Sequence, residues 1–188
     1  YLYDSALSTM WNVGQKMDFN ATFAAGRMMG FARFELNHGV SPDLFDQIDF
    51  NTYRVGNVHD PCPAVHNLNQ LKDRDWTISA LDDENRKNGV AITKKTIDLA
   101  VRLGANSVIV HPGQVTGDRS MDKQLRKLYE EGALGTPEYE DLKSKMIADR
   151  QSRSSAHVEA VIKSVREIVA YAQKMKMSIG LENRYRYY

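Results

Sequence analysis

The hydrophobic pattern of the chain alternates short apolar runs with longer amphipathic stretches. Five runs have strand character, at residues 6–10, 31–36, 53–59, 106–111 and 177–182. Between them, apolar residues recur at the three- and four-residue spacing of helices. This alternation is typical of α/β folds, because parallel strands must be joined by crossover connections that are usually helical. The pattern therefore predicts five strands in the order βαβαβαβαβ and a parallel sheet.

Individual runs sharpen this prediction. The unbroken sequence Val108-Ile109-Val110 predicts a strand buried on both faces. A helix is predicted over residues 82–103, since its apolar positions share one side and Gly104 follows as a natural stop. One further helix is expected after Thr136, which is a capping residue followed by Pro137 at the first helical position. Another helix is expected from Val158. Shorter helices are predicted at 18–29 and 42–48.

The lengths of the connections differ along the chain. The first three strands follow each other closely, whereas long stretches follow His59 and His111. Parallel α/β folds build their binding sites at the carboxyl ends of strands, so these stretches are where a site is expected. Residues 117–155 are dense in alternating acids and bases. We interpret them as a solvated helical insertion rather than a nucleic-acid-binding arm.

Composition narrows the class of protein. The 188 residues suit one domain, and 42% hydrophobic residues suffice for a packed core. The balance of 25 Lys and Arg against 24 Asp and Glu argues against a polybasic surface for nucleic acid or membranes. A single cysteine, Cys62, allows no internal disulfide, and no apolar run approaches the roughly 18 residues of a membrane span. These features predict a cytoplasmic globular protein.

Three predicted strands end in side chains that can bind metal. His59, His111 and Glu182 close the third, fourth and fifth strands. Neighbouring strands of a parallel sheet lie roughly 5 Å apart, so inward side chains at one level converge. Two imidazoles and a carboxylate suit a divalent ion such as Zn, Mn, Mg or Fe. We therefore predict that these three residues share a metal site.

Other interpretations remain open for single residues. A lone strand-end histidine is more often a hydrogen-bonded structural group, and Glu182 could equally cap a helix. Glu35, at the end of the second strand, is either an acid–base or supporting group of the site or a surface charge. His38 and His157 are predicted to lie on the surface. The aromatic and basic residues 184–188 could bind phosphate or simply form the rim of the fold.

Several segments, in the right order, resemble the xylose isomerase-like TIM barrel superfamily, which contains sugar phosphate isomerases and epimerases and type IV apurinic endonucleases. They are Ala6-Leu-Ser-Thr-Met-Trp11, His59-Asp-Pro-Cys-Pro63, Thr93-Lys-Lys-Thr-Ile-Asp-Leu-Ala100 with Leu103-Gly-Ala105, Val110-His-Pro-Gly113 and Gly180-Leu-Glu-Asn-Arg184. By this resemblance, His59, His111 and Glu182 fall where the endonuclease branch places metal ligands. Glu182 also falls where the isomerase branch places a metal-binding carboxylate.

The resemblance also sets expectations for the architecture. An eightfold barrel takes about 250 residues. We therefore expect residues 1–188 to form a single, incomplete (β/α)8 barrel with about five βα units, an insertion at 117–155, and the last three strands absent. The later metal ligands and the second catalytic carboxylate of the family have no match here.

Three functions follow as hypotheses. The first is a metal-dependent sugar or sugar-phosphate isomerase/epimerase, with Glu182 and Glu35 as catalytic candidates beside the metal. The second is a metal phosphodiesterase resembling the type IV apurinic endonucleases. The third is a non-catalytic partial-barrel scaffold. We expect a small carbohydrate as the partner, no nucleic acid and no membrane, with self-association favoured by the open sheet edges.

Overall fold

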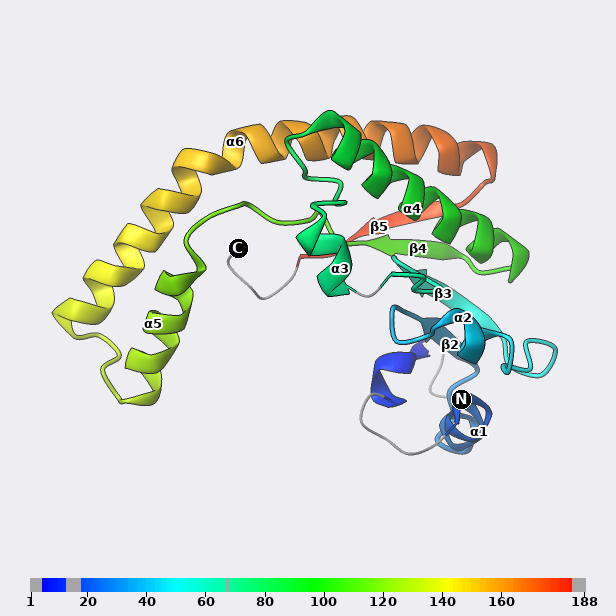
Figure 1. The fold of residues 1–188 in the computed structure, drawn as a ribbon. Coiled ribbons are helices and arrows are strands. Elements are labelled where there is room, and N and C mark those ends of the chain that lie inside the picture. Colours follow the sequence, from blue (N-terminus) through cyan, green and yellow to red (C-terminus); the bar gives the residue numbers. More distant parts are fainter. Residues whose placement is uncertain (1–4, 13–17, 67, 184–188) are drawn as a thin grey trace.

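The computed structural model describes residues 5–12, 18–66 and 68–183, and its centre is a single parallel sheet. The five strands lie in chain order, each paired with the next, as shown in Figure 1. They are β1 (Ala6–Ser8), β2 (Arg33–Leu36), β3 (Val55–His59), β4 (Ser107–Val110) and β5 (Ser178–Leu181). The predicted strand order and parallel sheet are confirmed. The tail at 184–188 lies outside the described residues.

Helices connect consecutive strands. The short 3-10 helix η1 (Thr9–Asn12) follows β1, and the α-helices are α1 (Phe19–Met28), α2 (Pro42–Phe45), α3 (Leu68–Asp73), α4 (Asp83–Arg102), α5 (Arg119–Glu130) and α6 (Pro137–Lys174). Figure 1 shows α4 and the second half of α6 side by side over β4 and β5. All strands run the same way, so the loops that follow them gather at one edge of the sheet.

The helix ends have the local chemistry that the sequence predicts. Asp82 accepts a hydrogen bond from the backbone N–H of Asn85 at 2.8 Å and so caps α4. Thr136 caps α6 in the same way through the N–H of Tyr139. Gly104, just beyond α4, has φ of +66°, a conformation that glycine adopts without strain. The predicted helix at 82–103 is thus confirmed within one residue at each end.

The hydrophobic core lies between the sheet and its helices. Every second residue of the central strands faces it, including Phe34, Leu36, Val58, Val108 and Val110, all at most 1% exposed. Phe34 stacks on Phe23 of α1 with ring centroids 4.2 Å apart. Burying each such side chain contributes roughly 1.5–3 kcal/mol, so this face of the sheet dominates stability.

The opposite face of the sheet is more open than the sequence predicts. In β4, Val108 and Val110 are buried, whereas Ser107 and Ile109 are only half-buried. The prediction that this strand is buried on both faces is therefore wrong. The physical reason is that its helices cover one face only, and the other face forms the inside of the curved sheet.

The segment after β4 forms a helical hairpin with α6. Figure 1 shows α5 and the first half of α6 side by side, reaching away from the sheet. The two helices predicted from Thr136 and Val158 are a single helix of 38 residues, so that prediction was wrong. Within α6 no glycine or proline follows Pro137, and ion pairs such as Asp149 with Arg153, 3.0 Å apart, stabilise its polar middle.

None of the described helices, α6 included, is both long enough and apolar enough to cross a membrane.

Candidate functional site

The three strand-end residues come together at the carboxyl edge of the sheet. His59 is the last residue of β3, His111 follows β4 directly, and Glu182 follows β5 directly. The backbone ladder continues to this edge, because Asp60 N–H donates to the Ile109 carbonyl at 2.8 Å and Glu182 N–H to the Val110 carbonyl at 3.1 Å. Backbone pairing therefore holds the three side chains at one level.

The side-chain atoms converge on one point. His59 Nε2 lies 3.1 Å from His111 Nε2 and 3.3 Å from Glu182 Oε2. One ligand atom from each residue lies within 4.8 Å of the others. Ligands bound at about 2.1 Å in tetrahedral geometry sit about 3.4 Å apart, so little movement is needed to place an ion between these atoms. We call these three residues the His–His–Glu cluster.

The second ring nitrogen of each histidine faces a hydrogen-bond acceptor on the side away from the cluster. His111 Nδ1 lies 3.0 Å from the Glu182 carbonyl oxygen, and His59 Nδ1 lies 3.4 Å from Glu35 Oε1. A carbonyl only accepts hydrogen bonds, so His111 carries its proton on Nδ1 when neutral and presents a bare Nε2. His59 presents Nε2 in the same way when its Nδ1–H donates to Glu35. Two facing lone pairs repel, and a shared cation removes that conflict.

Glu35 stands directly behind the cluster. Its carboxylate accepts from Asn57 Nδ2 at 3.1 Å as well as from His59, and its side chain is 17% exposed. Burial raises the pKa of Glu35, but hydrogen bonds from His59, Asn57 and Ser8 outweigh it, and the pKa falls below the usual 4.5. Glu35 is thus an ionised, orienting partner of His59 and not a surface charge. Its acid–base role stays a prediction.

Asp60 is a functional candidate that the sequence analysis did not single out. Its carboxylate accepts from Thr93 Oγ1 at 2.9 Å and Thr96 Oγ1 at 2.7 Å, both on α4. Burial raises the pKa of Asp60 to about 6, and the threonine hydrogen bonds limit the rise. The signal in the sequence was the spacing of three between the threonines, which puts both hydroxyls on one helix face. Asp60 therefore ties the end of β3 to α4.

Cys62, just beyond Asp60, is buried and unsuited to nucleophilic chemistry. Burial, with a smaller contribution from the charge of Asp60, raises the pKa of its thiol to about 12.

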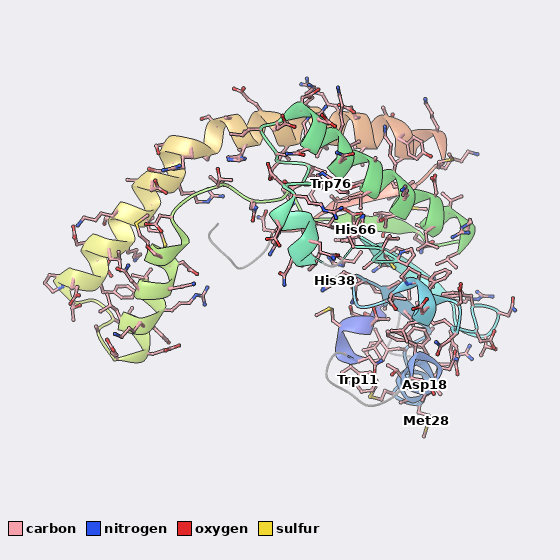
Figure 2. The ribbon with its side chains drawn as sticks, viewed as in Figure 1. Trp11, Asp18, Met28, His38, His66 and Trp76 are labelled. Carbon is pink, nitrogen blue, oxygen red and sulfur yellow. The ribbon has the colours of Figure 1, made fainter. Side chains whose placement is uncertain are left out.

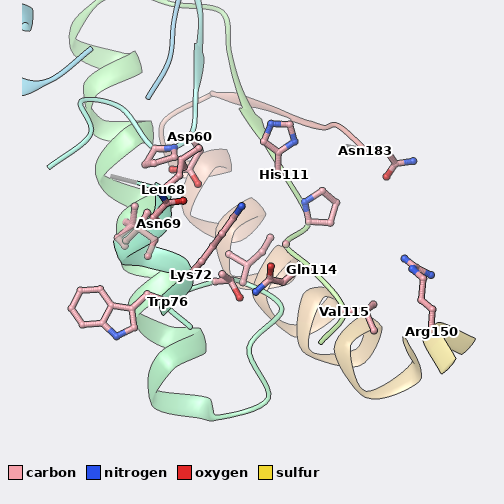
Figure 3. A pocket seen from close by; sticks show the side chains of 18 residues that line it. Asp60, Leu68, Asn69, Lys72, Trp76, His111, Gln114, Val115, Arg150 and Asn183 are labelled. Atoms are coloured by element: carbon pink, nitrogen blue, oxygen red, sulfur yellow. The ribbon is translucent and has the colours of Figure 1, made fainter. Parts of the chain in front are cut away.

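A cleft of about 700 Å³ opens beside the cluster. His111, Asp60 and Asn183 line it near the strand ends, α3 and α4 form further walls, and Arg150 of α6 completes it (Figure 3). The polar side chains of Lys72 and Gln114 also line it. This volume falls in the range of sites for small molecules.

His157 lies in the interior, so the prediction that it lies on the surface was wrong. It is 4% exposed, and its Nδ1 donates to the Ser79 carbonyl at 2.8 Å. Its Nε2 accepts from the backbone N–H of Thr116 at 3.2 Å. Position 157 is seven and eleven residues before the buried Ser164 and Ile168, a helical spacing that could have revealed it. The histidine joins α6 to two loops beside the cleft.

Two other histidines lie apart from the cluster. His66 packs edge to face against Trp76, whose ring lines the cleft, with ring centroids 5.6 Å apart (Figure 2). His38, labelled in the same figure, is half-buried after β2, so it is not fully on the surface as predicted.

Comparisons with known proteins identify the fold. No family model and no curated protein matches the sequence. Among solved structures, a D-tagatose 3-epimerase-like protein aligns with 95% of this chain at 18% identity and a TM-score of 0.55. The E. coli 3-keto-D-glucoside 4-epimerase YcjR aligns with 97% of it at 14% identity and a TM-score of 0.54. The fold is that of a partial TIM barrel.

This partial barrel covers only part of each solved neighbour. It spans 52% of the first chain and 56% of the second, about half of each. The predicted TIM-barrel fold is therefore confirmed for the part of the barrel that the chain spans.

Proposed function

We propose that the chain acts as a metal-dependent sugar or sugar-phosphate isomerase or epimerase. The observation that carries this proposal is the convergence of His59 Nε2, His111 Nε2 and Glu182 Oε2, with a hydrogen-bond acceptor behind each imidazole. Both solved neighbours are named after sugar epimerases, which supports a carbohydrate substrate.

Each residue of the cluster has a distinct part in this proposal. A divalent ion held there would polarise a sugar carbonyl and acidify the neighbouring C–H. His59 and His111 provide neutral nitrogen ligands, and Glu35 fixes the ring of His59. The side chain of Glu182 is 55% exposed, so its carboxylate can both bind the ion and reach a substrate proton. A second proton-transfer group is not assigned among the described residues.

The decisive experiment joins metal binding to proton exchange. Purified chain is stripped with a chelator and titrated with Zn²⁺ or Mn²⁺ in a calorimeter, and we expect one ion per chain. His111→Ala should lose this ion, while His66→Ala, a histidine outside the cluster, should keep it. A panel of ketoses in D₂O should then gain deuterium next to the carbonyl, by ¹H NMR, only with metal and with Glu182 intact. Absence of a stoichiometric ion would remove the proposal.

The facing histidines also fit a metal phosphodiesterase acting on abasic DNA. Two imidazoles at adjacent strand ends are the observation that favours it. The net charge of +1 weighs against it, because DNA binding usually draws on a basic surface. Nicking of an abasic duplex by the metal-loaded chain, with no deuterium exchange into ketoses, would replace the first proposal by this one.

A further inference from the structure

The chain just after His59 is joined to α4 by a buried polar contact. Asp60, the next residue, accepts hydrogen bonds from Thr96 Oγ1 at 2.7 Å and from Thr93 Oγ1 at 2.9 Å. Both threonines are at most 1% exposed. Burial of a carboxylate is unfavourable unless hydrogen bonds satisfy it, and an apolar contact of the same shape would often hold α4 as firmly. The polar contact therefore needs a reason beyond stability. We call Asp60, Thr93 and Thr96 the aspartate–threonine clamp.

The threonine hydroxyls of the clamp lie closer to Asp60 than to the backbone of their own helix. Thr93 Oγ1 is 3.3 Å from the Gly89 carbonyl oxygen, and Thr96 Oγ1 is 3.4 Å from the Ile92 carbonyl oxygen. Both distances exceed those to Asp60, because hydrogen bonds to an ionised carboxylate are shorter and stronger than those between neutral groups. Hydrogen bonds are directional, whereas apolar contacts are not. The clamp therefore fixes where Asp60 lies against α4.

The backbone around Asp60 is held as well. Asp60 N–H donates to the Ile109 carbonyl of β4 at 2.8 Å. Cys62 N–H donates to Thr96 Oγ1 at 3.2 Å, so one threonine contacts both the side chain of Asp60 and the backbone two residues later. Residues 60–62 are therefore fixed between β4 and α4. Because one peptide bond joins His59 to this segment, the His59 backbone cannot shift far without breaking one of these contacts.

The His–His–Glu cluster is sensitive to such a shift. His59 Nε2 lies 3.1 Å from His111 Nε2 and 3.3 Å from Glu182 Oε2, close to the separation of two ligands on one ion. Functional sites generally need their side chains held within about 0.5 Å of the productive geometry. The contact with Glu35 orients the ring of His59 but does not fix the backbone that carries the ring. The clamp does fix that backbone.

We propose that Asp60 is a positioning residue, which through Thr93 and Thr96 holds His59 where the cluster can bind a divalent ion. This role rests on the proposed function, and it extends the metal site to α4, a helix that carries none of the cluster residues. Asp60 acts through His59 and is not itself a ligand, because both of its carboxylate oxygens are bonded to the threonines. Loss of the clamp should therefore weaken binding of the ion and alter its coordination geometry.

The test removes the two hydroxyls and keeps the shape of the side chains. The double variant Thr93→Val/Thr96→Val puts a methyl group in place of each hydroxyl and leaves the charge of Asp60. In a calorimetric titration of the metal-free chain, this variant should bind Zn²⁺ about 10- to 100-fold more weakly than the parent chain, the usual effect of losing a group that orients a ligand. Co²⁺ in place of Zn²⁺ gives visible absorption bands that report coordination geometry, and these bands should shift or weaken.

Matched variants separate the position of His59 from the stability of the fold. Thr93→Ser/Thr96→Ser keeps both hydroxyls and should bind Zn²⁺ within about threefold of the parent chain. Thr22→Val on α1 removes another buried hydroxyl, which donates to Asn12 Oδ1 at 2.9 Å, and should lower stability without changing Zn²⁺ affinity. Urea unfolding of each metal-free variant measures its stability. Where the double valine variant fails to fold, Thr96→Val alone decides in its place.

The positioning role and the proposed function fail in different ways. A valine variant that is destabilised but keeps the Zn²⁺ affinity and Co²⁺ bands of the parent chain would make the clamp purely structural and overturn the inference. Weaker binding in Asp60→Asn but not in the valine variant would mean that the charge of Asp60 matters and its position does not, which would also overturn it. Zn²⁺ binding that depends on the clamp, with no deuterium exchange into any ketose, would retain the positioning role and reject the isomerase. Absence of a bound ion in the parent chain would overturn both.

Discussion

The two faces of the same five strands differ in what they do. On the outer face, Phe34, Val58 and Val108 are fully buried beneath helices. On the inner face, the adjacent residues Glu35 and His59 are partly exposed and hydrogen-bonded to each other. Since strand side chains alternate, neighbouring residues in the sequence belong to different faces. Residues that stabilise the core and residues that could take part in chemistry are thus adjacent in the sequence but lie on opposite faces of the sheet.

The largest effect is expected from a substitution that leaves a cavity on the outer face. Phe34→Ala should lower the free energy of unfolding by about 3–5 kcal/mol, because a fully buried ring that stacks on Phe23 is lost. Urea unfolding followed by circular dichroism measures this value. Where the variant remains folded, its affinity for Zn²⁺ should match that of the parent chain. A loss of metal affinity as large as the loss of stability would show that the two faces are not independent.

The reverse change removes a ligand from the inner edge. His111→Ala should weaken metal binding by more than about 100-fold. Removing a direct ligand should cost more than removing a residue that only hydrogen-bonds to a ligand, which costs about 10- to 100-fold. The unfolding free energy of the metal-free chain should change little, since the ring contributes no core packing and sits among polar groups. Calorimetric titration and urea unfolding of the same preparation give both numbers. Unaltered Zn²⁺ affinity would exclude His111 as a ligand.

These two faces also explain how far the sequence could predict the molecule. Strand order and the convergence of His59, His111 and Glu182 follow from local pattern, because parallel pairing brings successive strand ends to one edge. The half-open inner face of β4 was missed, since an apolar triplet does not reveal what covers each side. Only the fold determines that.

Contacts between distant segments account for the remaining errors. His157 was predicted to lie on the surface because the local sequence does not show its hydrogen-bond acceptor, the Ser79 carbonyl, which is 78 residues away. Lys72 and Arg150 line the same cleft, although Arg150 lies in the part of α6 before residue 155, which is dense in charge and was predicted to be separate from the helix that begins at Val158. Local periodicity predicts where strands end, but it does not predict which residues from distant segments come into contact.

A smaller effect is expected one residue from Phe34. Glu35→Gln keeps the size of the side chain but removes the charge behind His59, so metal affinity should fall by about 10- to 100-fold. Stability of the metal-free chain should change much less than in Phe34→Ala. The matched control is Glu159→Gln, an exposed acid on α6. If Glu35→Gln lowered stability and left metal affinity unchanged, Glu35 would be a structural residue of the sheet.

The smallest effect concerns the surface of the helical layer. Asp83, at the start of α4, contacts Lys163 of α6 at 2.6 Å and Lys87 at 2.8 Å. Hydrogen bonds from Lys163, then from Lys87 and Arg86, hold the pKa of this carboxyl well below its usual range. A carboxyl whose pKa is lower in the folded state stabilises the fold above its unfolded pKa of about 3.9, and this stabilisation disappears as the pH falls below that value.

Asp83→Asn tests whether the outer layer depends on charge as well as on apolar contact. The variant should be slightly less stable than the parent chain at pH 6, and the difference should shrink as the pH is lowered from about 5 toward 2. Because the group is exposed, salt should also diminish the difference. Urea unfolding at both pH limits, at low and high salt, measures it. A large loss of stability that does not depend on salt would mean that this ion pair, and not apolar burial alone, holds α6 on α4. The outer face of the sheet would then depend on polar interactions as the inner face does.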